Sequence, residues 1–386
     1  MHKRTGMIAR AMERKAIALS QKYPFVVITG PRQSGKTTLA KTAFPDYRKV
    51  SLEDIDNRMF ASQDPRGFIS TYPDRTIIDE VQRVPSLLSY LQTHCDDVGR
   101  DGMYILTGSQ NLQLMEAVDQ SLAGRVGLLH LLPFSKSEME AGGILPQSID
   151  EKLLYGCYPR LYDKGIAPDD YYPNYISTYA ERDLRSLKDI SDLGKFVRFL
   201  KLCAARVGQL LNKSSLANDC GISVPTIDSW LSILESSYIL FLLKPDHCNY
   251  SKRLVKAPKL YFYDTGLACS LLEIKTPAQM NTHYLRGNLF ENMVISDFMK
   301  NDYNKGIIEP SVSFWRDSAG NEVDLLHRDG NKEDAYEIKS AETFNESFLK
   351  GLKYWSKLSG AEASDLHVIY GGRTPMMRSD ASVETF

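Results

Sequence analysis

The sequence predicts an α/β protein of three consecutive domains, and two patterns along the chain support this. In residues 1–145, short apolar runs alternate with helical patterns, which is typical of a parallel sheet covered by helices on both faces. Residues 151–240 are mainly helical in pattern, the pattern turns to strand over residues 238–263, and further strand patterns follow beyond residue 312. The boundaries are marked by Gly142-Gly143 with Pro146 and by Thr276-Pro277-Ala278, so we expect domains at 1–145, 146–276 and 277–386.

Composition narrows the class of protein. The chain has 386 residues, of which 43% are hydrophobic and 25% charged, with a formal net charge of −1. This is ordinary globular composition and excludes a polybasic or polyacidic protein. The six cysteines form no CxxC pair, so we expect neither a disulfide framework nor a thiolate metal site. Without a signal-peptide core or an apolar run near 18 residues, we expect a cytoplasmic protein with no membrane span.

The first domain is predicted to start with a helix over residues 8–22. The apolar runs that follow it predict a series of buried strands, at residues 25–29, 49–52, 76–78, 103–107 and 126–132. Helical patterns lie between most of them, as a parallel sheet requires.

The strongest motif directly follows the first of these strands. It satisfies GxxxxGK[ST] and reads Gly30-Pro31-Arg32-Gln33-Ser34-Gly35-Lys36-Thr37-Thr38. Between a strand and a helix, such a loop surrounds phosphate oxygens with backbone N–H groups and the positive end of the helix dipole. We therefore predict that residues 30–38 bind ATP, with Lys36 reaching the β- and γ-phosphates and the Thr37 hydroxyl binding Mg²⁺.

A second acidic motif completes this prediction. The strand Thr76-Ile77-Ile78 ends in Asp79 and Glu80. We predict that the Asp79 carboxylate lies beside Mg²⁺ and that the Glu80 carboxylate polarises the water that attacks the γ-phosphate. The extra strand at residues 49–52 lies between the two motifs. It favours the ATPases that carry a catalytic glutamate over small kinases and GTPases.

Two further residues are candidates for the ATPase reaction. Ser109, with Thr107 as an alternative, follows the fourth strand and could sense the γ-phosphate, although a plain strand-to-helix turn also uses small polar residues. Arg125 could stabilise the transition state, either within the chain or across a subunit interface. A surface salt bridge is the competing interpretation of Arg125.

The middle domain carries a helix-turn-helix-like spacing at Ala217, Gly221 and Ile227. Its second helix, residues 224–236, has no Lys or Arg, so packing is favoured over the reading of DNA bases. A basic segment follows, which could hold nucleic-acid phosphates without reading sequence or could be an ordinary solvated face. Its basic residues are Lys244, Lys252, Arg253, Lys256 and Lys259.

The last domain contains a pattern of acidic residues and a lysine. Glu291 lies in a predicted helix, and Asp324 lies in a strand. Glu337 and Lys339 stand two apart in the next strand, so they share one face. Glu291, Asp324 and Glu337 could bind a divalent metal, and Lys339 could position a water that attacks a phosphodiester. This is the PD-(D/E)xK nuclease pattern, with Val323 in place of the proline.

Several segments together resemble a known family. They include GPRQSGKTTLA, IIDEVQRVPSLLSYLQ, YILTGSQNLQLM, YISTYAERDLRSL, GNLFENMVISDF, FWRDSAGNEVDLL and YEIKSAETF. Over nearly its whole length, the chain is similar to bacterial and archaeal AAA-superfamily ATPases with a C-terminal domain of unknown function. The resemblance implies a P-loop NTPase parallel sheet, a helical winged-helix-like domain and an α+β, restriction-endonuclease-like C-terminal domain. It carries over the nucleotide roles of Gly30, Gly35, Lys36, Thr37, Asp79 and Glu80, but no substrate.

These patterns lead to one main hypothesis and two alternatives. The main one is a Mg²⁺-dependent, ATP-hydrolysing switch whose nucleotide state repositions the other two domains. The alternatives are a non-catalytic, nucleotide-gated binding module and an ATP-dependent metal nuclease acting on DNA or RNA. Residues 281–386 carry 12 basic against 17 acidic residues, a charge of −5 that disfavours unaided DNA binding. A protein partner or an oligomer is also compatible with the sequence.

Overall fold

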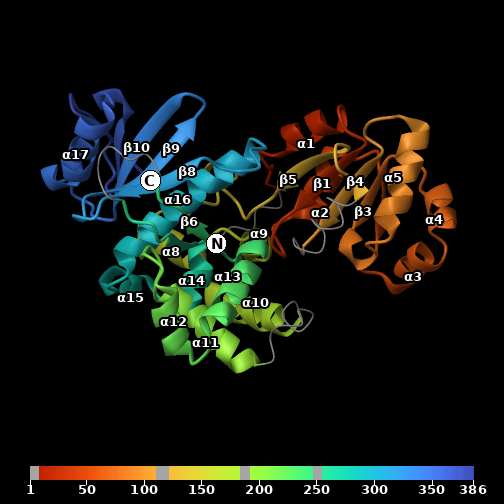
Figure 1. Cartoon of the computed structure of the whole chain (residues 1–386), viewed down its shortest axis with the longest axis horizontal. Coiled ribbons are helices and arrows are strands. Elements are labelled where there is room, and N and C mark those ends of the chain that lie inside the picture. Colours follow the sequence, from red (N-terminus) through yellow and green to blue (C-terminus); the bar gives the residue numbers. More distant parts are fainter. Residues whose placement is uncertain (1–7, 110–120, 183–191, 247–253) are drawn as a thin grey trace.

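The computed structural model describes residues 8–109, 121–182, 192–246 and 254–386, with the side chains of residues 179–182 left out. The N-terminal sheet lies at one end of the molecule in Figure 1, and the C-terminal sheet lies at the other. The helices of the middle region lie below and between them.

The N-terminal sheet has five parallel strands in the order β2-β3-β4-β1-β5. Its strands are β1 (Phe25–Thr29), β2 (Arg48–Ser51), β3 (Thr76–Asp79), β4 (Tyr104–Gly108) and β5 (Val126–His130). The described helices around it are α1 (Glu13–Ser20), α2 (Lys36–Ala43), α3 (Ile55–Gln63), α4 (Pro65–Thr71), α5 (Leu87–Val98) and α7 (Lys136–Ala141). The predicted parallel α/β sheet is confirmed.

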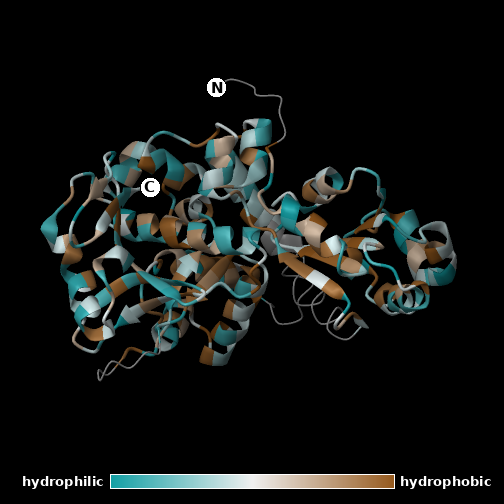
Figure 2. Ribbon diagram, turned by 90° about the horizontal axis from the view of Figure 1, so that it is seen from above, coloured by the Kyte–Doolittle hydropathy of each residue, from teal (hydrophilic) through white to brown (hydrophobic). Residues whose placement is uncertain are grey.

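Both faces of this sheet are buried. Alternate residues of β1 point to opposite sides, so Val26 and Ile28 enter one hydrophobic cluster while Phe25 and Val27 enter another. Figure 2 shows hydrophobic residues concentrated on these strands. The cluster around Val26 continues through the middle region and reaches Ile369 in the C-terminal sheet, so one hydrophobic cluster extends through all three parts of the chain.

The middle region is mostly helical and ends in a small antiparallel sheet. Its elements are α8 (Ile149–Tyr155), α9 (Pro159–Lys164), α10 (Pro168–Arg182), α11 (Leu193–Ala204), α12 (Lys213–Cys220), α13 (Val224–Ser236), β6 (Leu240–Leu243), β7 (Lys259–Phe262), α14 (Thr265–Leu271) and α15 (Pro277–Thr282). Gly221 lies between α12 and α13 with a φ of 68°, a left-handed turn that glycine adopts readily. Ile227 and Trp230 of α13 are buried, as expected for a packing helix.

The C-terminal region is a mixed sheet flanked by helices. Its elements are α16 (Arg286–Asn304), β8 (Val312–Arg316), β9 (Glu322–Asp329), β10 (Lys332–Lys339), α17 (Lys350–Ser359), β11 (Leu366–Tyr370), β12 (Met376–Met377) and β13 (Ser382–Thr385). Strands β8, β9 and β10 form an antiparallel meander, and β11 then pairs with β10 in parallel. The last two strands were not predicted from the sequence.

Candidate functional site

The P-loop lies at the carboxyl end of β1 and leads directly into α2. Gly30 has a φ of 147°, and a Cβ at this position would lie 2.1 Å from the carbonyl oxygen of Leu131. Only glycine fits so close an approach between backbones. Gly35 has a φ of 95° and caps the N-terminus of α2. These two glycines therefore shape the loop as the motif predicts.

A buried lysine lies inside this loop. Lys36 is 6% exposed, and its Nζ donates to the carbonyl oxygens of Gly30 at 2.9 Å and Pro31 at 2.8 Å. From outside the motif, the Arg10 guanidinium donates to the Ser34 carbonyl at 2.7 Å and pairs with the buried Glu138 at 3.0 Å. No motif marks Arg10 in the sequence, because its partners lie far along the chain.

A hydrogen bond joins the two nucleotide motifs. The Thr37 hydroxyl donates to Oδ1 of Asp79 at 2.9 Å, and the Thr107 hydroxyl donates to the same oxygen. Lys49 lies 3.3 Å from the other carboxylate oxygen of Asp79. Because β1 and β3 are parallel strands of one sheet, their carboxyl ends lie on the same edge and bring Thr37 and Asp79 together. Lys49 is a neighbour that sequence reasoning did not assign.

Glu80 takes an unusual backbone conformation immediately beside this pair. Its φ is 58°, in the left-handed region that is uncommon for residues other than glycine and is often found at functional sites. Its carboxylate accepts a hydrogen bond from Ser109 at 3.3 Å and another from Gln82. The predicted residues Glu80 and Ser109 are therefore neighbours in space, whereas Thr107 is bound to Asp79 instead.

Arg125 does not lie at this edge of the sheet. It directly precedes β5, whose first residue Val126 is aligned with Phe25 at the amino end of β1. A five-residue strand spans roughly 16 Å, so Arg125 and the P-loop lie at opposite ends of the sheet. Its guanidinium binds both carboxylate oxygens of Asp96, at 2.6 and 3.0 Å. The prediction that Arg125 acts at the nucleotide site of the same chain is therefore wrong. The structure contains the competing salt bridge, which Arg125 forms with Asp96.

The donor set of the P-loop fits a magnesium nucleotide. A hydroxyl from Thr37 and a carboxylate from Asp79 are oxygen ligands of the kind that Mg²⁺ takes, and they already lie side by side. The glycine-lined loop and the ammonium of Lys36 supply groups suited to phosphate oxygens.

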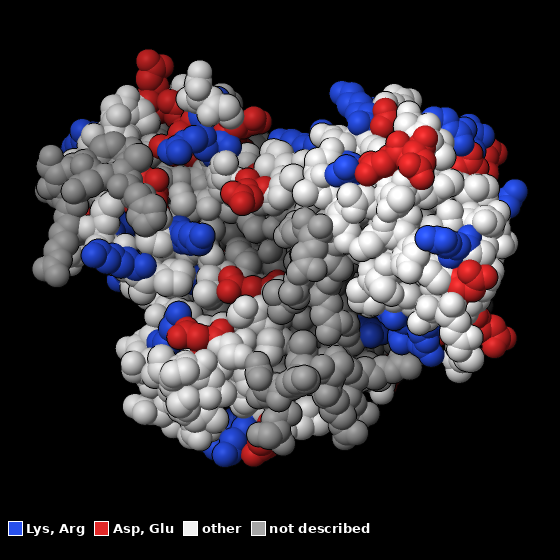
Figure 3. All heavy atoms as spheres, turned by 45° about the vertical axis from the view of Figure 1, so that its right-hand side comes forward, with Lys and Arg blue, Asp and Glu red and all other residues white. Residues whose placement is uncertain are grey.

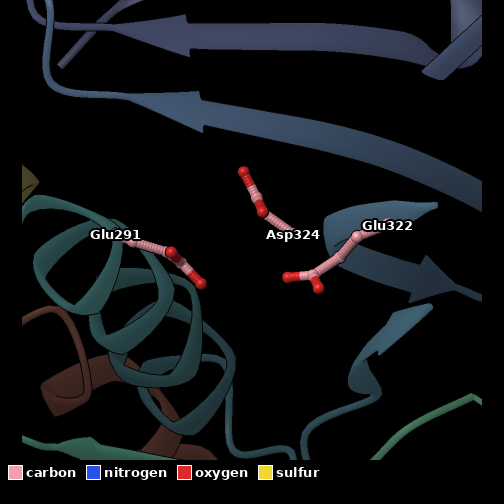
Figure 4. A group of neighbouring side chains, drawn as sticks. All are labelled: Glu291, Glu322 and Asp324. Carbon is pink, nitrogen blue, oxygen red and sulfur yellow. The ribbon is translucent and has the colours of Figure 1, made fainter. Parts of the chain in front are cut away.

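A second acidic site lies between α16 and the C-terminal sheet. Carboxylate oxygens of Glu291, Glu322 and Asp324 all lie within 4.8 Å of one another. Figure 4 shows Glu291 reaching from the helix towards the two residues on β9. Glu291 and Asp324 were predicted as ligands, but Glu322 was not. Glu322 stands two residues before Asp324, so the two-residue period of a strand could have placed both carboxylates on one face.

Glu337 and Lys339 lie on the same face of β10, as predicted. The Lys339 ammonium bridges Glu337 at 2.6 Å and Asp324 at 3.1 Å. Asp324 also accepts from the Ile338 backbone N–H at 2.8 Å. Burial, followed by the charge of Asp324, raises the pKa of Glu337 to about 8. Burial would also raise the pKa of Asp324, but Lys339 and Lys259 outweigh it and lower that pKa.

Lys259 belongs to this acidic site and not to a basic surface. It is 3% exposed, and its Nζ lies 2.9 Å from Oε1 of Glu291 and also pairs with Glu322. Tyr261, two residues along β7, donates to the same Glu291 oxygen. The prediction that Lys259 contacts nucleic acid is therefore wrong, because a buried ammonium held by two carboxylates cannot reach a phosphate backbone.

The rest of the basic segment is arranged differently. Lys244 and Lys256 are exposed, while Lys252 and Arg253 lie outside the described residues. The backbone of Lys244 accepts a hydrogen bond from Phe314 of β8 at 3.2 Å. Asp246 and Val255 bond to the same strand, so the described residues 244–246 and 254–255 lie along the edge of the C-terminal sheet.

A buried polar cluster joins the P-loop strand to the middle region. Thr29, the residue before Gly30, has its hydroxyl 2.8 Å from Nδ1 of His130 and 3.1 Å from the hydroxyl of Tyr238. Tyr238 lies 2.6 Å from the same ring nitrogen of His130. Tyr238 follows α13 with a φ of 56°. The ring of His130 also contacts Tyr303 of α16, with ring centres 5.3 Å apart.

Three consecutive regions of the chain match known protein families. Residues 22–140 match the family model "AAA domain", residues 146–278 match "Domain of unknown function (DUF8612)", and residues 286–385 match "Domain of unknown function (DUF4143)". The first match, together with the P-loop and the parallel sheet, supports an AAA-type ATPase domain. It also supports the expectation of a bound nucleotide.

Two curated relatives and two solved structures illustrate the similarity. "Uncharacterized protein Rv2008c" of Mycobacterium tuberculosis and "Uncharacterized protein Mb2031c" of Mycobacterium bovis are each 27% identical over 97% of this chain and 82% of their own length. The Walker-type ATPase of Pyrococcus abyssi is 15% identical, with a TM-score of 0.48 over 70% of this chain and 97% of its own. AMPPCP-bound DnaA from Aquifex aeolicus is 14% identical, with a TM-score of 0.29 over 58% and 85%.

Among the residues that the structure describes, no helix combines the length and apolar character needed to cross a bilayer.

Proposed function

We propose that this protein is an ATP-hydrolysing molecular switch whose nucleotide state is transmitted to the middle and C-terminal regions. The observation that carries the proposal is the hydrogen bond between Thr37 and Asp79, since it joins the two nucleotide motifs at one point. The proposed switch involves all three domains, which we place at residues 1–145, 146–276 and 277–386.

Each residue at the P-loop has a distinct proposed role. Residues 30–38 bind the phosphates, and Lys36 supplies positive charge to their oxygens. Thr37 and Asp79 hold Mg²⁺, which would neutralise charge on the β- and γ-phosphates. Glu80 takes the proton of the attacking water, and Ser109 orients the Glu80 carboxylate through the hydrogen bond at 3.3 Å. Arg125 retains a role only across a subunit interface of an oligomer.

Transmission starts at the residue before the P-loop. Thr29 contacts both His130 on the neighbouring strand and Tyr238 at the end of α13. A shift of the P-loop on nucleotide binding would therefore be transmitted to the helix-turn-helix-like pair α12 and α13 through direct side-chain contacts. The contact between His130 and Tyr303 gives α16 the same connection.

The winged-helix-like and nuclease-like assignments remain part of the proposal. The helices α11, α12 and α13 followed by the β6–β7 pair support the first. The order α16, β8, β9, β10, α17, β11 and the acidic cluster support the second. Lys244 and Lys256 are the exposed candidates for nucleic-acid phosphates. Over the face in Figure 3, however, basic side chains are interspersed with acidic ones.

The experiment that tests the proposal is steady-state ATP turnover by the full chain with Mg²⁺. It is measured alone and with single-stranded DNA, double-stranded DNA and RNA. Turnover supports the switch, and stimulation by one nucleic acid identifies it as a partner. Tight ATP binding without turnover under all conditions would contradict the proposal and support a nucleotide-gated binding module. Phosphodiester cleavage in the same samples would support the nuclease alternative.

A further inference from the structure

The acidic cluster of the C-terminal region already contains a cation. The Lys259 ammonium lies 2.9 Å from Glu291 and pairs with Glu322, and the charge of Asp324 also acts on it. The Nζ of Lys259 therefore lies between two carboxylates of the cluster and forms ion pairs with both.

We propose that Lys259 is a built-in counter-ion that takes the place of a divalent cation between Glu291, Glu322 and Asp324. As folded, the cluster does not fit a metal ion in addition, because the ion would have to lie beside a buried ammonium. The cluster is then an ion-paired joint between the middle and C-terminal regions. It becomes a divalent-cation site only when Lys259 is withdrawn or replaced.

The distances among the carboxylates explain why a cation is needed there. Oxygens bound to one Mg²⁺ or Ca²⁺ ion at about 2.0–2.6 Å lie no more than roughly 4–5 Å apart, and these oxygens lie within 4.8 Å. Three carboxylates this close repel one another strongly unless a positive group compensates them. Lys259 supplies that group to Glu291 and Glu322, and Lys339 supplies it to Asp324 at 3.1 Å. Arg316 adds a second contact to Glu322 at 2.8 Å.

Lys259 is fixed in this position by its backbone. It is the first residue of β7, aligned with Leu243 of β6, and it also forms a β-bridge with Leu210. The ring of Phe314 lies 5.4 Å from its Nζ, at a distance suited to a cation–π contact. The side chain is therefore not a mobile surface lysine that could move aside to admit an ion.

A second contact clamps the two regions at the same place. Asn292, the residue after Glu291 on α16, accepts from the backbone N–H of Phe262 and donates to its carbonyl oxygen, both at 2.7 Å. These bonds hold α16 against β7, so that the ammonium and the carboxylate stay together. Withdrawal of Lys259 from the cluster requires β7 and α16 to separate, which would expose the buried amide of Asn292.

The test uses Mn²⁺ binding to the full chain without nucleotide. Lys36→Ala is present throughout, because it weakens nucleotide retention at the P-loop site. In this background, Lys259→Met removes the charge and keeps most of the side-chain volume. We expect it to bind one Mn²⁺ at the cluster by isothermal titration calorimetry, at least about 100-fold more tightly than the chain with Lys259. Adding Glu291→Gln should abolish that binding, and Lys353→Met, on the exposed surface of α17, should not create it.

Two results would overturn the proposal. One is Glu291-dependent Mn²⁺ binding that is equally tight in the chain with Lys259 and in the Lys259→Met variant. The other is a folded Lys259→Met chain that binds no Mn²⁺. If Lys259→Met does not fold in EDTA, refolding is repeated with MnCl₂ and compared with Lys259→Arg, which keeps the charge. Rescue of Lys259→Met by Mn²⁺ supports the proposal, and folding of Lys259→Arg without rescue of Lys259→Met contradicts it.

Discussion

The hydroxyl of Tyr238 lies 3.1 Å from Oγ1 of Thr29, across the boundary between the ATPase sheet and the middle region. Thr29 is the last residue of β1, and the P-loop begins at the next position. Tyr238 is buried and lies one residue beyond the C-cap of α13. The nucleotide loop and the helix-turn-helix-like pair are therefore linked through one pair of hydroxyl groups.

We predict that Tyr238→Phe uncouples these two parts. The ring remains, but Thr29 and His130 lose a hydrogen-bonding partner, which should lower the free energy of unfolding by about 1 kcal/mol. ATP affinity should stay close to that of the unmodified chain. The change in hydrogen exchange of the α13 amides on adding a non-hydrolysable ATP analogue should disappear. Tyr284→Phe, at a residue 77% exposed, is the control; an unchanged exchange response in Tyr238→Phe would exclude the coupling role.

Lys36→Ala should weaken ATP binding at least about 10-fold, since hydrogen bonds to charged groups are worth about 1.5–3 kcal/mol. Binding of a fluorescent ATP analogue measures this directly. Lys41→Ala changes an exposed lysine on the same helix α2 and should bind as the unmodified chain does. Equal affinities for the two variants would argue against the proposed nucleotide site.

Glu80→Gln should separate binding from hydrolysis. The amide keeps the size of the side chain but cannot accept a proton from water, so kcat should fall roughly 10²- to 10⁴-fold. The affinity for ATP should change only a few-fold, because Lys36, Thr37 and Asp79 are untouched. Steady-state turnover and equilibrium binding are measured together, with Glu53→Gln as an exposed control. Normal turnover in Glu80→Gln would remove the general-base role.

His130 should make stability depend on pH. Burial lowers its pKa to about 4, against about 6.5 for an exposed imidazole. Below about pH 6.5 the unfolded chain binds a proton that the folded chain does not, so stability falls as the pH drops towards 4. The full effect is about 3 kcal/mol. Thermal unfolding between about pH 7 and 4.5 should show a smaller decrease in Tm for His130→Gln than for the unmodified chain. An equal decrease in Tm for the two chains would contradict this role of His130.

The N-terminal region was predictable because its signals are local. The motif at residues 30–38 and the acidic pair Asp79–Glu80 each follow an apolar strand, and parallel strands bring their carboxyl ends to one edge. The nucleotide-binding motifs and the parallel sheet could thus be derived from the residues, whereas the AAA-type assignment rested on the family resemblance. Glu337 and Lys339 could be placed on one face because the two-residue period of a strand is also a local signal.

The tertiary structure alone decided which charges face one another. The sequence placed Lys259 among basic neighbours, but the β6–β7 pairing and the packing of α16 bury its ammonium between Glu291 and Glu322. It also left Arg125 as a candidate for catalysis, until strand direction put that residue at the opposite end of the sheet. Local motifs specify the nucleotide loop because their residues are adjacent in the chain. Ion pairs between distant segments depend on how those segments pack, which no local pattern records.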